Sequence, residues 1–329
     1  PLLDLKRLEV ARALASAPRL ILLDEVSAGL SESDLVEVIE LIRGIGEQGT
    51  ALVIVEHVQE VVKQLAQRVI VLNWGRVFAE GTPESVADDE RVREVYFGAR
   101  DAESIHTQVR ERPPVVAGQG LVLRDVVVKR GQHLALNGAS LEVPRGSITA
   151  VLGPNGAGKT TLSQSISGLL PVAGGELEYD GRDMRRVPAH ARAAAGIAHC
   201  QEGRKLFAGL TVEENLMLGA FGKRRVERQD LAELVFADFP VLRDRRDQVA
   251  TTMSGGQQQM LAIARALMSE PTLLVLDELT LGLSPKAADE IYEVLERISA
   301  RGMSLLLLEQ NAERPTRIAD QVYVLSHGR

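Results

Sequence analysis

The sequence feature that most constrains the fold is an internal repeat. When the 329-residue chain is compared with itself at an offset of 253 positions, residues 1–76 align with residues 254–329 without a gap, and 27 of the 76 aligned positions are identical. Two unrelated segments of ordinary composition would share about four or five identities over that length. A repeat of this length is typical of a duplicated domain, not of a short solenoid unit. The sequence therefore predicts the back part of one domain followed by most of a second copy.

A segment of mixed charge, proline and glycine separates the two copies. It covers residues 98–119 and shows no apolar period, which is typical of a linker. We therefore predict a first fragment at residues 1–97 and a second domain at residues 120–329. The chain begins at Pro1 inside a helix-like pattern and stops directly after a strand-like run, so we expect it to be an excerpt of a longer protein, cut at both ends.

Composition and charge exclude several classes of protein. Apolar residues make up 45% of the chain and charged residues 25%, which is typical of a folded globular protein and not of a disordered one. No apolar run approaches the roughly 18 residues of a membrane-spanning helix. The net charge of −7 argues against a nucleic-acid partner. The single Cys200 and six scattered histidines give neither a disulfide nor a metal-ligand spacing, and they fit a reducing cytosolic compartment.

Apolar patterns predict strands and helices that alternate along the chain. Short continuous apolar runs predict strands that are buried on both faces, at residues 19–23 and 51–55 among others. The alternation with amphipathic helices predicts an α/β fold with a mostly parallel sheet covered by helices. The predicted strands are residues 19–23, 51–55, 69–72, 148–152, 272–276, 304–308 and 322–325, and the predicted helices are residues 5–16, 33–47, 258–269 and 286–300.

A glycine-rich segment follows the predicted strand 148–152 and precedes a helical pattern. It matches the phosphate-binding pattern G-x-x-x-x-G-K-[ST] in the strand–loop–helix context that this pattern requires. Backbone N–H groups of such a loop, and those at the start of its helix, favour phosphate groups. Lys159 is predicted to reach the β- and γ-phosphates and Thr160 to bind Mg²⁺. The predicted nucleotide-binding residues of the loop are Gly153, Pro154, Asn155, Gly156, Ala157, Gly158, Lys159, Thr160 and Thr161.

Two acidic residues follow the predicted strand 272–276. Asp277 is placed to hold Mg²⁺ through water, and Glu278 to activate the attacking water, because phosphoryl transfer needs positioning and charge neutralisation. The first copy repeats the pair as Asp24 and Glu25. An acidic cap on the next helix is the alternative interpretation. The phosphate loop and the repetition of the pair favour catalysis.

A second glycine-containing segment begins the predicted helix 258–269. It holds Ser254, Gly255, Gly256 and Gln257, and a serine with two glycines at a helix start can cradle an anion. One domain needs one such cradle for one nucleotide, so the second cradle indicates a role toward the nucleotide of a neighbouring copy. An ordinary N-cap is the alternative, and spacing alone does not decide between the two.

Together, the phosphate loop, the segment Met253–Gln257 and the pair Asp277–Glu278 resemble the ABC-type ATPases. The resemblance covers both copies. It implies a P-loop NTPase fold with a mixed sheet, flanking helices and a helical subdomain at about residues 202–257. It also implies ATP and Mg²⁺ as cofactors. In this family two ATPase halves pair head to tail, and each ATP lies between the phosphate loop of one half and the signature of the other.

Further motifs resemble the two ATP-binding subunits of branched-chain amino-acid importers. These motifs are residues 21–25, 55–57 and 75–83 in the first copy and residues 196–207, 210–216 and 308–311 in the second. The resemblance implies a fusion of the two sister subunits that hydrolyses ATP to import branched-chain amino acids or related small amides. The implied partners are transmembrane permease subunits and, through them, a solute-binding protein. The implied location is the cytoplasmic face of the membrane.

The switch position and the signature depart from the family pattern in ways that make the two ATP sites unequal. The switch histidine is matched by His57 in the first copy but by Gln310 in the second. The signature of the first copy reads Pro1–Leu5, in which Leu2 and Leu3 carry side chains where a close backbone is needed and Asp4 adds negative charge. We therefore expect this excerpt to bind ATP but to turn it over slowly.

Two further positions of the family pattern are altered or ambiguous. The aromatic residue that usually stacks on adenine is replaced near Arg130, which can stack as a cation. The glutamine that contacts Mg²⁺ is matched by either Gln201 or Glu202.

Two other functions share the nucleotide motifs. One is a soluble tandem ABC ATPase that acts on ribosomes or nucleic acid, against which the short linker and the net negative charge argue. The other is a nucleotide-binding regulator without catalysis, because each copy carries an altered motif.

Overall fold

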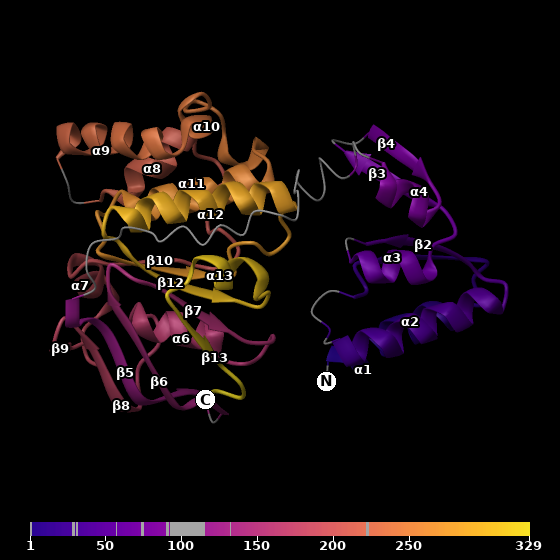
Figure 1. Cartoon of the computed structure of the whole chain (residues 1–329), viewed down its shortest axis with the longest axis horizontal. Coiled ribbons are helices and arrows are strands. Elements are labelled where there is room, and N and C mark those ends of the chain that lie inside the picture. Colours follow the sequence, from indigo (N-terminus) through magenta and orange to yellow (C-terminus); the bar gives the residue numbers. More distant parts are fainter. Residues whose placement is uncertain are drawn as a thin grey trace. The chain divides into compact units, whose positions relative to one another are not determined.

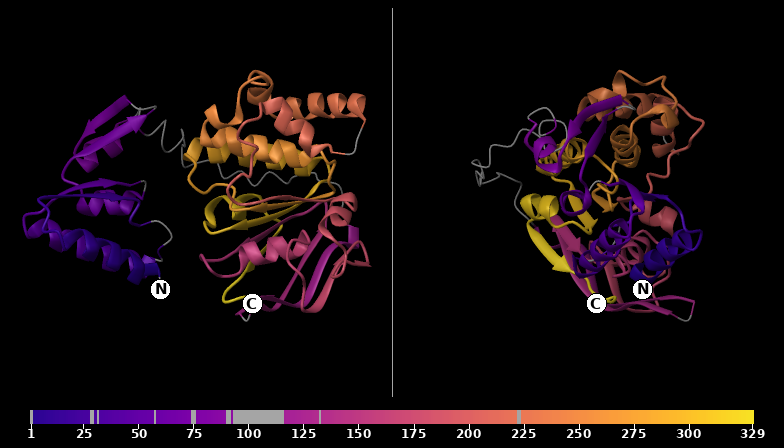
Figure 2. Two further views of the ribbon diagram at one scale, coloured as in Figure 1. Left: turned by 180° about the vertical axis from the view of Figure 1, so that it is seen from behind. Right: turned by 90° about the vertical axis from the view of Figure 1, so that its right-hand side faces the viewer.

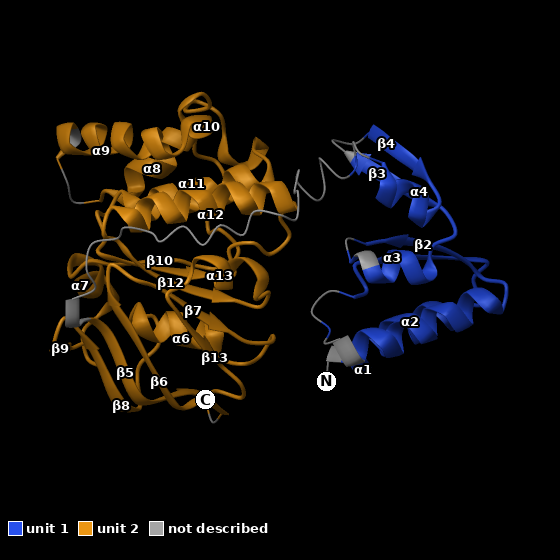
Figure 3. Ribbon diagram, in the orientation of Figure 1, with its two compact units in different colours: residues 1–103 blue, residues 104–329 orange. Residues whose placement is uncertain are grey.

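The computed structural model of the chain divides into two units, Pro1–Glu103 and Ser104–Arg329 (Figure 3). The division falls within the segment predicted as a linker. Strand β5 begins at Val116, however, so the last four residues of the predicted linker 98–119 belong to a strand. The structure describes residues 2–27, 30, 32–56, 58–73, 76–89, 92, 116–131, 133–221 and 224–329.

Unit 1 alternates helices with strands, in indigo to purple in Figure 1. Strands β1 and β2 pair in parallel, and β3 and β4 pair antiparallel. Helix α1 begins earlier than predicted and ends before Ala17, whose backbone is left-handed (φ 48°). The elements of unit 1 are α1 (Leu2–Leu14), β1 (Leu20–Asp24), α2 (Glu32–Glu47), β2 (Ala51–Val55), α3 (Gln59–Leu65), β3 (Val69–Asn73), β4 (Arg76–Gly81) and α4 (Pro83–Asp88).

Strands β1 and β2 are covered on one face only. Their buried face packs with apolar side chains of α1 and α2. The prediction that residues 19–23 and 51–55 are buried on both faces is therefore wrong, because a two-stranded sheet needs a second layer to cover its other face. In the described residues of these strands, the buried side chains include Ile21 and Leu23, and the exposed ones include Leu20, Leu22, Val53 and Val55.

Unit 2 is built on a parallel sheet with the strand order β10-β11-β12-β7-β13. Strands β7, β11 and β12 are buried along their whole length, which confirms the prediction from their continuous apolar runs. The strands are β7 (Ile148–Leu152), β10 (Ile197–Cys200), β11 (Leu273–Asp277), β12 (Ser304–Glu309) and β13 (Gln321–Val324).

A separate antiparallel sheet, of order β6-β5-β8-β9, lies on one side of the parallel sheet with helix α6 (Figures 1 and 2). The prediction of one mixed sheet is therefore wrong, because the parallel and antiparallel strands form different sheets around a shared core. That core joins apolar side chains of α6 to those of both sheets. The elements on this side are β5 (Val116–Arg130), β6 (His133–Arg145), α6 (Lys159–Ile166), β8 (Gly174–Tyr179), β9 (Arg182–Asp183) and α7 (Ala189–Ala194).

Helices cover the opposite face of the parallel sheet (Figure 2). The predicted helical subdomain at residues 202–257 contains α8, α9, α10 and the short 3₁₀ helix η2. Helix α11 begins within this range at Gly255, which is earlier than the predicted start at residue 258. It ends beyond residue 257, and its apolar side chains pack against the parallel sheet. The elements on this side are α8 (Val212–Gly219), α9 (Arg225–Asp238), α10 (Pro240–Arg243), η2 (Ala250–Thr252), α11 (Gly255–Leu267), α12 (Pro285–Ala300) and α13 (Glu313–Ile318).

Candidate nucleotide-binding site

The phosphate loop connects the buried strand β7 to helix α6. The Gly153 N–H donates to the carbonyl oxygen of Glu309 (3.2 Å), which ties the start of the loop to the end of β12. Gly156 and Gly158 have φ angles of 82° and 110°, in the left-handed region that favours glycine. A Cβ atom on Gly158 would also lie 2.9 Å from Cδ2 of Leu136. The conformation of the loop therefore requires glycine at these two positions.

Lys159 is the first residue of α6, and its side chain turns back along the loop. Its Nζ donates to the carbonyl oxygens of Gly153 (2.7 Å) and Pro154 (3.2 Å), and it forms an ion pair with Glu278 (3.0 Å). The residue is 4% exposed. A buried ammonium group beside the free N–H groups of a helix start is an arrangement that binds phosphate.

The other predicted loop residues differ in exposure. Backbone and small side chains dominate the loop, so phosphate oxygens can approach N–H groups closely. Within the loop, Pro154, Asn155 and Gly156 are exposed, Thr160 is half-buried, and Ala157 and Thr161 are buried.

Asp277 ends β11 and is 1% exposed. Ser163 Oγ donates to its Oδ2 (2.8 Å), whereas its Oδ1 has no hydrogen-bond partner among the described residues. Burial raises the pKa of Asp277, and the hydrogen bond from Ser163 opposes this effect. Carboxylate oxygens are the ligands that hard divalent cations prefer. The buried Oδ1 therefore fits the predicted role of Asp277 toward Mg²⁺.

Magnesium at this place would need ligands from the nucleotide as well. No group of three or more His, Cys, Asp and Glu side chains is placed to hold a metal ion in the described part of the chain. Mg²⁺ in nucleotide sites is commonly held by one or two protein groups together with phosphate oxygens and waters. Thr160 and Asp277 are the protein groups that would hold it here, and the ion would neutralise charge on the phosphates.

Glu278 directly follows Asp277 and adopts a left-handed backbone conformation (φ 47°). Its N–H donates to the carbonyl oxygen of Leu308 (2.9 Å). Glu25 of unit 1 has the same geometry. Its φ angle is 44°, and its N–H donates to the carbonyl oxygen of Val55 (2.9 Å). Non-glycine residues persist in this region only when their surroundings hold them there. The two acidic pairs thus share one local structure, although Asp24 and Glu25 are exposed.

Three polar residues follow strands of the parallel sheet next to Asp277. Gln310 directly follows β12 and is exposed, and Gln201 directly follows β10 and is half-buried. Strand β11 lies between β10 and β12, so both residues flank the end of β11. Glu202 is exposed, and its negative charge contributes to the raised pKa of Asp277. The fold therefore brings Gln201, Glu202 and Gln310 to the sheet edge where Asp277 and Glu278 lie.

Arg130 lies at the end of β5 and is exposed. Its Nη2 donates to Oε1 of Gln164 in α6 (2.6 Å). The guanidinium group is therefore next to the helix that begins with Lys159, which is compatible with the predicted contact to the base of a nucleotide.

Ser254 caps helix α11 at the predicted signature. Its Oγ accepts from the Gln257 N–H (3.3 Å), and Gln257 Oε1 accepts from the Ser254 N–H (3.1 Å). Gly255 and Gly256 form the first turn. A Cβ atom on Gly256 would lie 2.7 Å from Cβ of Ala287, so glycine is also required here by packing against α12. The segment combines an N-cap with the backbone donors of a helix start.

The signature of the first copy, residues 1–5, has a different structure. Pro1 lies outside the described residues, and α1 begins at Leu2. Leu3 is buried among core side chains of unit 1. Asp4 and Leu5 are exposed. His57, the predicted switch residue of this copy, lies outside the described residues.

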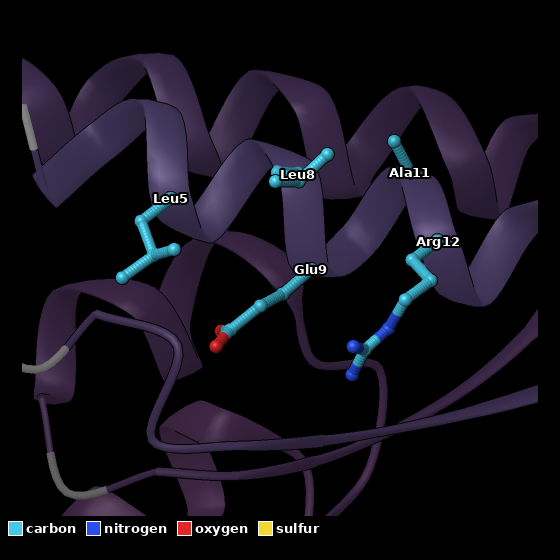
Figure 4. Close-up of a pocket in the computed structure, with 5 residues that line it drawn as sticks. All are labelled: Leu5, Leu8, Glu9, Ala11 and Arg12. Carbon is cyan, nitrogen blue, oxygen red and sulfur yellow. The ribbon is translucent and has the colours of Figure 1, made fainter.

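A hollow of about 520 Å³ lies along α1 in unit 1 (Figure 4). Apart from Leu5, its lining contains none of the predicted site residues, and it has neither a glycine loop nor paired acids. It therefore does not correspond to a nucleotide site. The lining residues are Leu5, Leu8, Glu9, Ala11 and Arg12.

Sequence reasoning missed three residues that support the site. Ser163, which binds Asp277, lies three residues after Thr160, and this spacing on a helix was a usable signal. Glu309 is buried and is identical to Glu56 in the repeat. Arg192 is 1% exposed and donates to carbonyl oxygens of Ser165 and Ile166 at the end of α6, and no pattern in the sequence marks it.

Comparisons with known proteins agree with this fold. The family model for the ABC transporter matches residues 136–281, and the model for the branched-chain amino acid ATP-binding cassette transporter matches residues 76–102. A crystal structure of a nucleotide-free ATP-binding cassette from an ABC transporter is 27% identical. It covers 64% of this chain and 88% of its own chain, with a TM-score of 0.59.

Two curated relatives extend the comparison. The high-affinity branched-chain amino acid transport ATP-binding protein BraG of Pseudomonas aeruginosa is 44% identical over 199 residues, which are 60% of this chain and 85% of that protein. The probable branched-chain amino acid transport ATP-binding protein LivF of Archaeoglobus fulgidus is 41% identical over 189 residues, 57% of this chain and 80% of that protein.

The fold defines an ATPase domain of the ABC type, a class of proteins that binds ATP. The chain belongs to the ABC transporter ATP-binding proteins of the branched-chain amino acid transport type.

Proposed function

We propose that the chain is the ATP-binding and hydrolysing subunit that powers an ABC importer of branched-chain amino acids or related small amides. The observation that carries this proposal is the cluster of Lys159, Asp277 and Glu278 at the phosphate loop. The solute class rests on the relatives BraG and LivF, which are named for branched-chain amino acid transport.

The proposed division of labour follows from the contacts of each side chain. Lys159 and the loop N–H groups bind the phosphates, and Thr160 and Asp277 hold Mg²⁺. Glu278 accepts a proton from the attacking water, and its ion pair with Lys159 already places it next to the loop. Gln310 would hydrogen-bond the γ-phosphate, and either Gln201 or Glu202 would contact Mg²⁺, because all three follow strands at the same edge of the sheet.

The chain is further proposed to carry parts of two sister ATPase subunits in tandem. The ungapped repeat supports this, as does the shared geometry of Glu25 and Glu278. The branched-chain family model matches residues 76–102 and begins at the last of the aligned residues 1–76. In the tandem protein the two halves would pair head to tail.

The proposed partners are transmembrane permease subunits and, through them, a solute-binding protein, at the cytoplasmic face of the membrane. Within the described residues, no helix is both long and apolar enough to cross a membrane. The helical subdomain exposes several apolar side chains that a permease subunit could cover. They are Leu218, Phe221, Val226 and Leu234.

Reconstitution with permease subunits and a solute-binding protein tests this function. The wild-type protein should support ATP-dependent uptake of leucine into vesicles, and Lys159→Ala should lower both uptake and ATPase activity, because ATP at this loop keeps the two halves together. Arg182→Ala, which removes an exposed cation on β9, is the matched control and should support normal uptake. Uptake by Lys159→Ala that equals that of the wild type would contradict the assignment.

A further inference from the structure

Glu309 is a buried carboxylate that the proposed ATPase chemistry does not use. It ends β12 directly before Gln310 and is 3% exposed. In the described structure, the Thr280 hydroxyl lies 3.4 Å from each of its carboxylate oxygens, and the Tyr292 hydroxyl donates to Oε1 at 3.4 Å. A carboxylate removed from water needs such donors, so an apolar residue would be the simpler choice if packing were its only role.

The same contact occurs in unit 1. Glu56 aligns with Glu309 in the repeat, and Ser27 aligns with Thr280. Glu56 accepts hydrogen bonds from the Ser27 N–H (2.9 Å) and the Ser27 hydroxyl (2.7 Å). The two units have different surroundings and share only 27 of 76 aligned residues, yet both keep a carboxylate opposite a hydroxyl residue. Packing accidents do not recur in this way.

The carboxylate holds the turn on which the catalytic glutamate lies. Glu278 has a left-handed backbone, and its N–H is bound by the carbonyl oxygen of Leu308. Two residues further along the turn, Thr280 is bound by the side chain of Glu309. Consecutive residues of β12 therefore fix both ends of a strained turn, and such turns keep their conformation only when several contacts hold them.

We propose that Glu309, and Glu56 in the first copy, are positioning residues of the ATPase sites. Each carboxylate fixes the turn after the catalytic glutamate against the end of the neighbouring strand. Because Gln310 is the next residue after Glu309, the same contact sets the separation between the switch position and Glu278. The inference rests on the proposed ATPase function and adds to it the side chains that hold Glu278 and Glu25 in place.

Hydrogen exchange tests whether the carboxylate holds the turn. Glu309→Ala and Thr280→Val should each raise the exchange rates of the backbone amides at positions 279 and 280 about tenfold or more, because the turn opens more often. Glu309→Gln keeps the size of the side chain and provides a second variant where the alanine protein unfolds. Glu290→Gln makes the same chemical change on the exposed face of α12 and is the control. Unchanged exchange in both Glu309 variants would overturn the proposal.

Kinetics test whether this positioning matters for hydrolysis. In the protein reconstituted with its permease subunits, Glu309→Gln combined with Glu56→Gln should lower kcat about tenfold or more, since small misplacements of a catalytic group slow the chemical step. KM for ATP should stay within about twofold, because the carboxylates bind groups of the turn, whereas ATP binds the phosphate loop. Thr280→Ser keeps the hydroxyl group and should retain most of the kcat that Thr280→Val loses.

Two outcomes separate the possible failures. Faster exchange with an unchanged kcat per folded protein would show a merely structural contact and overturn the positioning role. An inactive wild-type protein would instead contradict the proposed function, and the exchange rates would still decide whether Glu309 holds the turn.

Discussion

The two copies of the repeat place matching residues in different surroundings. Leu20 in β1 and Leu273 in β11 are aligned by the repeat, but Leu20 is 51% exposed and Leu273 is 0% exposed. The strand pairing is nevertheless shared, since Leu20 pairs with Ala51 in β2 and Leu273 pairs with Ser304 in β12. Strand pairing thus follows from the local sequence, whereas burial depends on which layers the rest of the chain provides.

The layer that covers Leu273 is visible in unit 2. Leu273 and Val275 share a core cluster with Leu162 and Ile166 of α6 and with side chains of the antiparallel sheet. Figure 2 shows this layer on one side of the parallel sheet. Among the described residues of unit 1, the corresponding core cluster joins β1 and β2 mainly to side chains of α1 and α2. These helices lie on one face of the two strands.

Helices α1 and α11 show the same contrast. Leu8 of α1 is 64% exposed, and its counterpart Leu261 in α11 is fully buried. In unit 2, Val212 and Leu216 of α8 belong to the cluster that buries Leu261. In unit 1, Figure 4 shows Leu8 between Leu5 and Ala11 along α1. Both exposed faces of unit 1 therefore match faces that other elements cover in unit 2.

The contrast between the copies extends to the proposed ATP sites. In a head-to-tail pair, Glu25 would act opposite the intact signature Ser254–Gln257, whereas Glu278 would act opposite residues 1–5, which lack both glycines. A cradle without glycine brings fewer backbone donors close to a phosphate. We therefore expect the site of Glu25 to perform most of the hydrolysis.

The largest expected effect comes from removing one catalytic carboxylate at a time. In the proposed tandem protein with its permease subunits, Glu25→Gln should lower steady-state ATP hydrolysis by about 100-fold or more, because it removes the proposed general base. Glu278→Gln should be milder. Hydrolysis rates in reconstituted membranes measure both. A larger loss in Glu278→Gln would reverse the assignment, and equal losses would show that the sites are coupled.

The next prediction tests the difference in burial between the aligned residues Leu20 and Leu273. Leu273→Ala should lower the free energy of unfolding of unit 2 by about 2–5 kcal/mol, since it leaves a cavity in a closed core. Leu20→Ala makes the same change on an exposed face and should lower the stability of unit 1 by less than about 1 kcal/mol. Denaturant unfolding of both variants measures this. A similar loss in Leu20→Ala would mean that another element covers this face in the protein.

The limits of sequence reasoning are visible in the same residues. Strands 51–55 and 148–152 were predicted with the correct ends, because their apolar runs stop at polar or glycine residues. The phosphate loop was predicted because its glycines and Lys159 are close in sequence. The burial of Leu20 was predicted wrongly because a sequence pattern does not show which layers are present. Glu309 was missed because its partner Thr280 is 29 positions away.

A smaller effect is expected on the affinity for ATP, which should depend on Lys159 of unit 2 and not on an exposed lysine of unit 1. Lys159→Ala removes a charge-assisted contact to the phosphates, and we expect the binding free energy of ATP to weaken by about 1.5–3 kcal/mol, or ten- to about a hundredfold. Titration of a fluorescent ATP analogue with and without Mg²⁺ measures this. Lys63→Ala changes an exposed lysine of α3 in unit 1 and should leave the affinity unchanged. Equal affinity of Lys159→Ala and wild type would refute the loop assignment.

The smallest expected effect concerns the pH dependence of stability, and it arises from the deeper burial of β12. Burial, together with the negative charge of Glu278, raises the pKa of Glu309 from its ordinary value of 4.5 to about 7. The folded state then binds this proton more tightly than the unfolded state, so this residue makes the free energy of unfolding fall as pH rises from about 4.5 to 7. Glu309→Gln cannot ionise and should lack that fall, which amounts to about 2 kcal/mol between pH 5 and pH 7.5. Urea unfolding at pH 5 and pH 7.5 measures it, with Glu290→Gln as the exposed control. If Glu309→Gln loses as much stability as the wild type between these pH values, Glu309 does not take up a proton on folding. The difference in burial between the two units would then not extend to the end of β12.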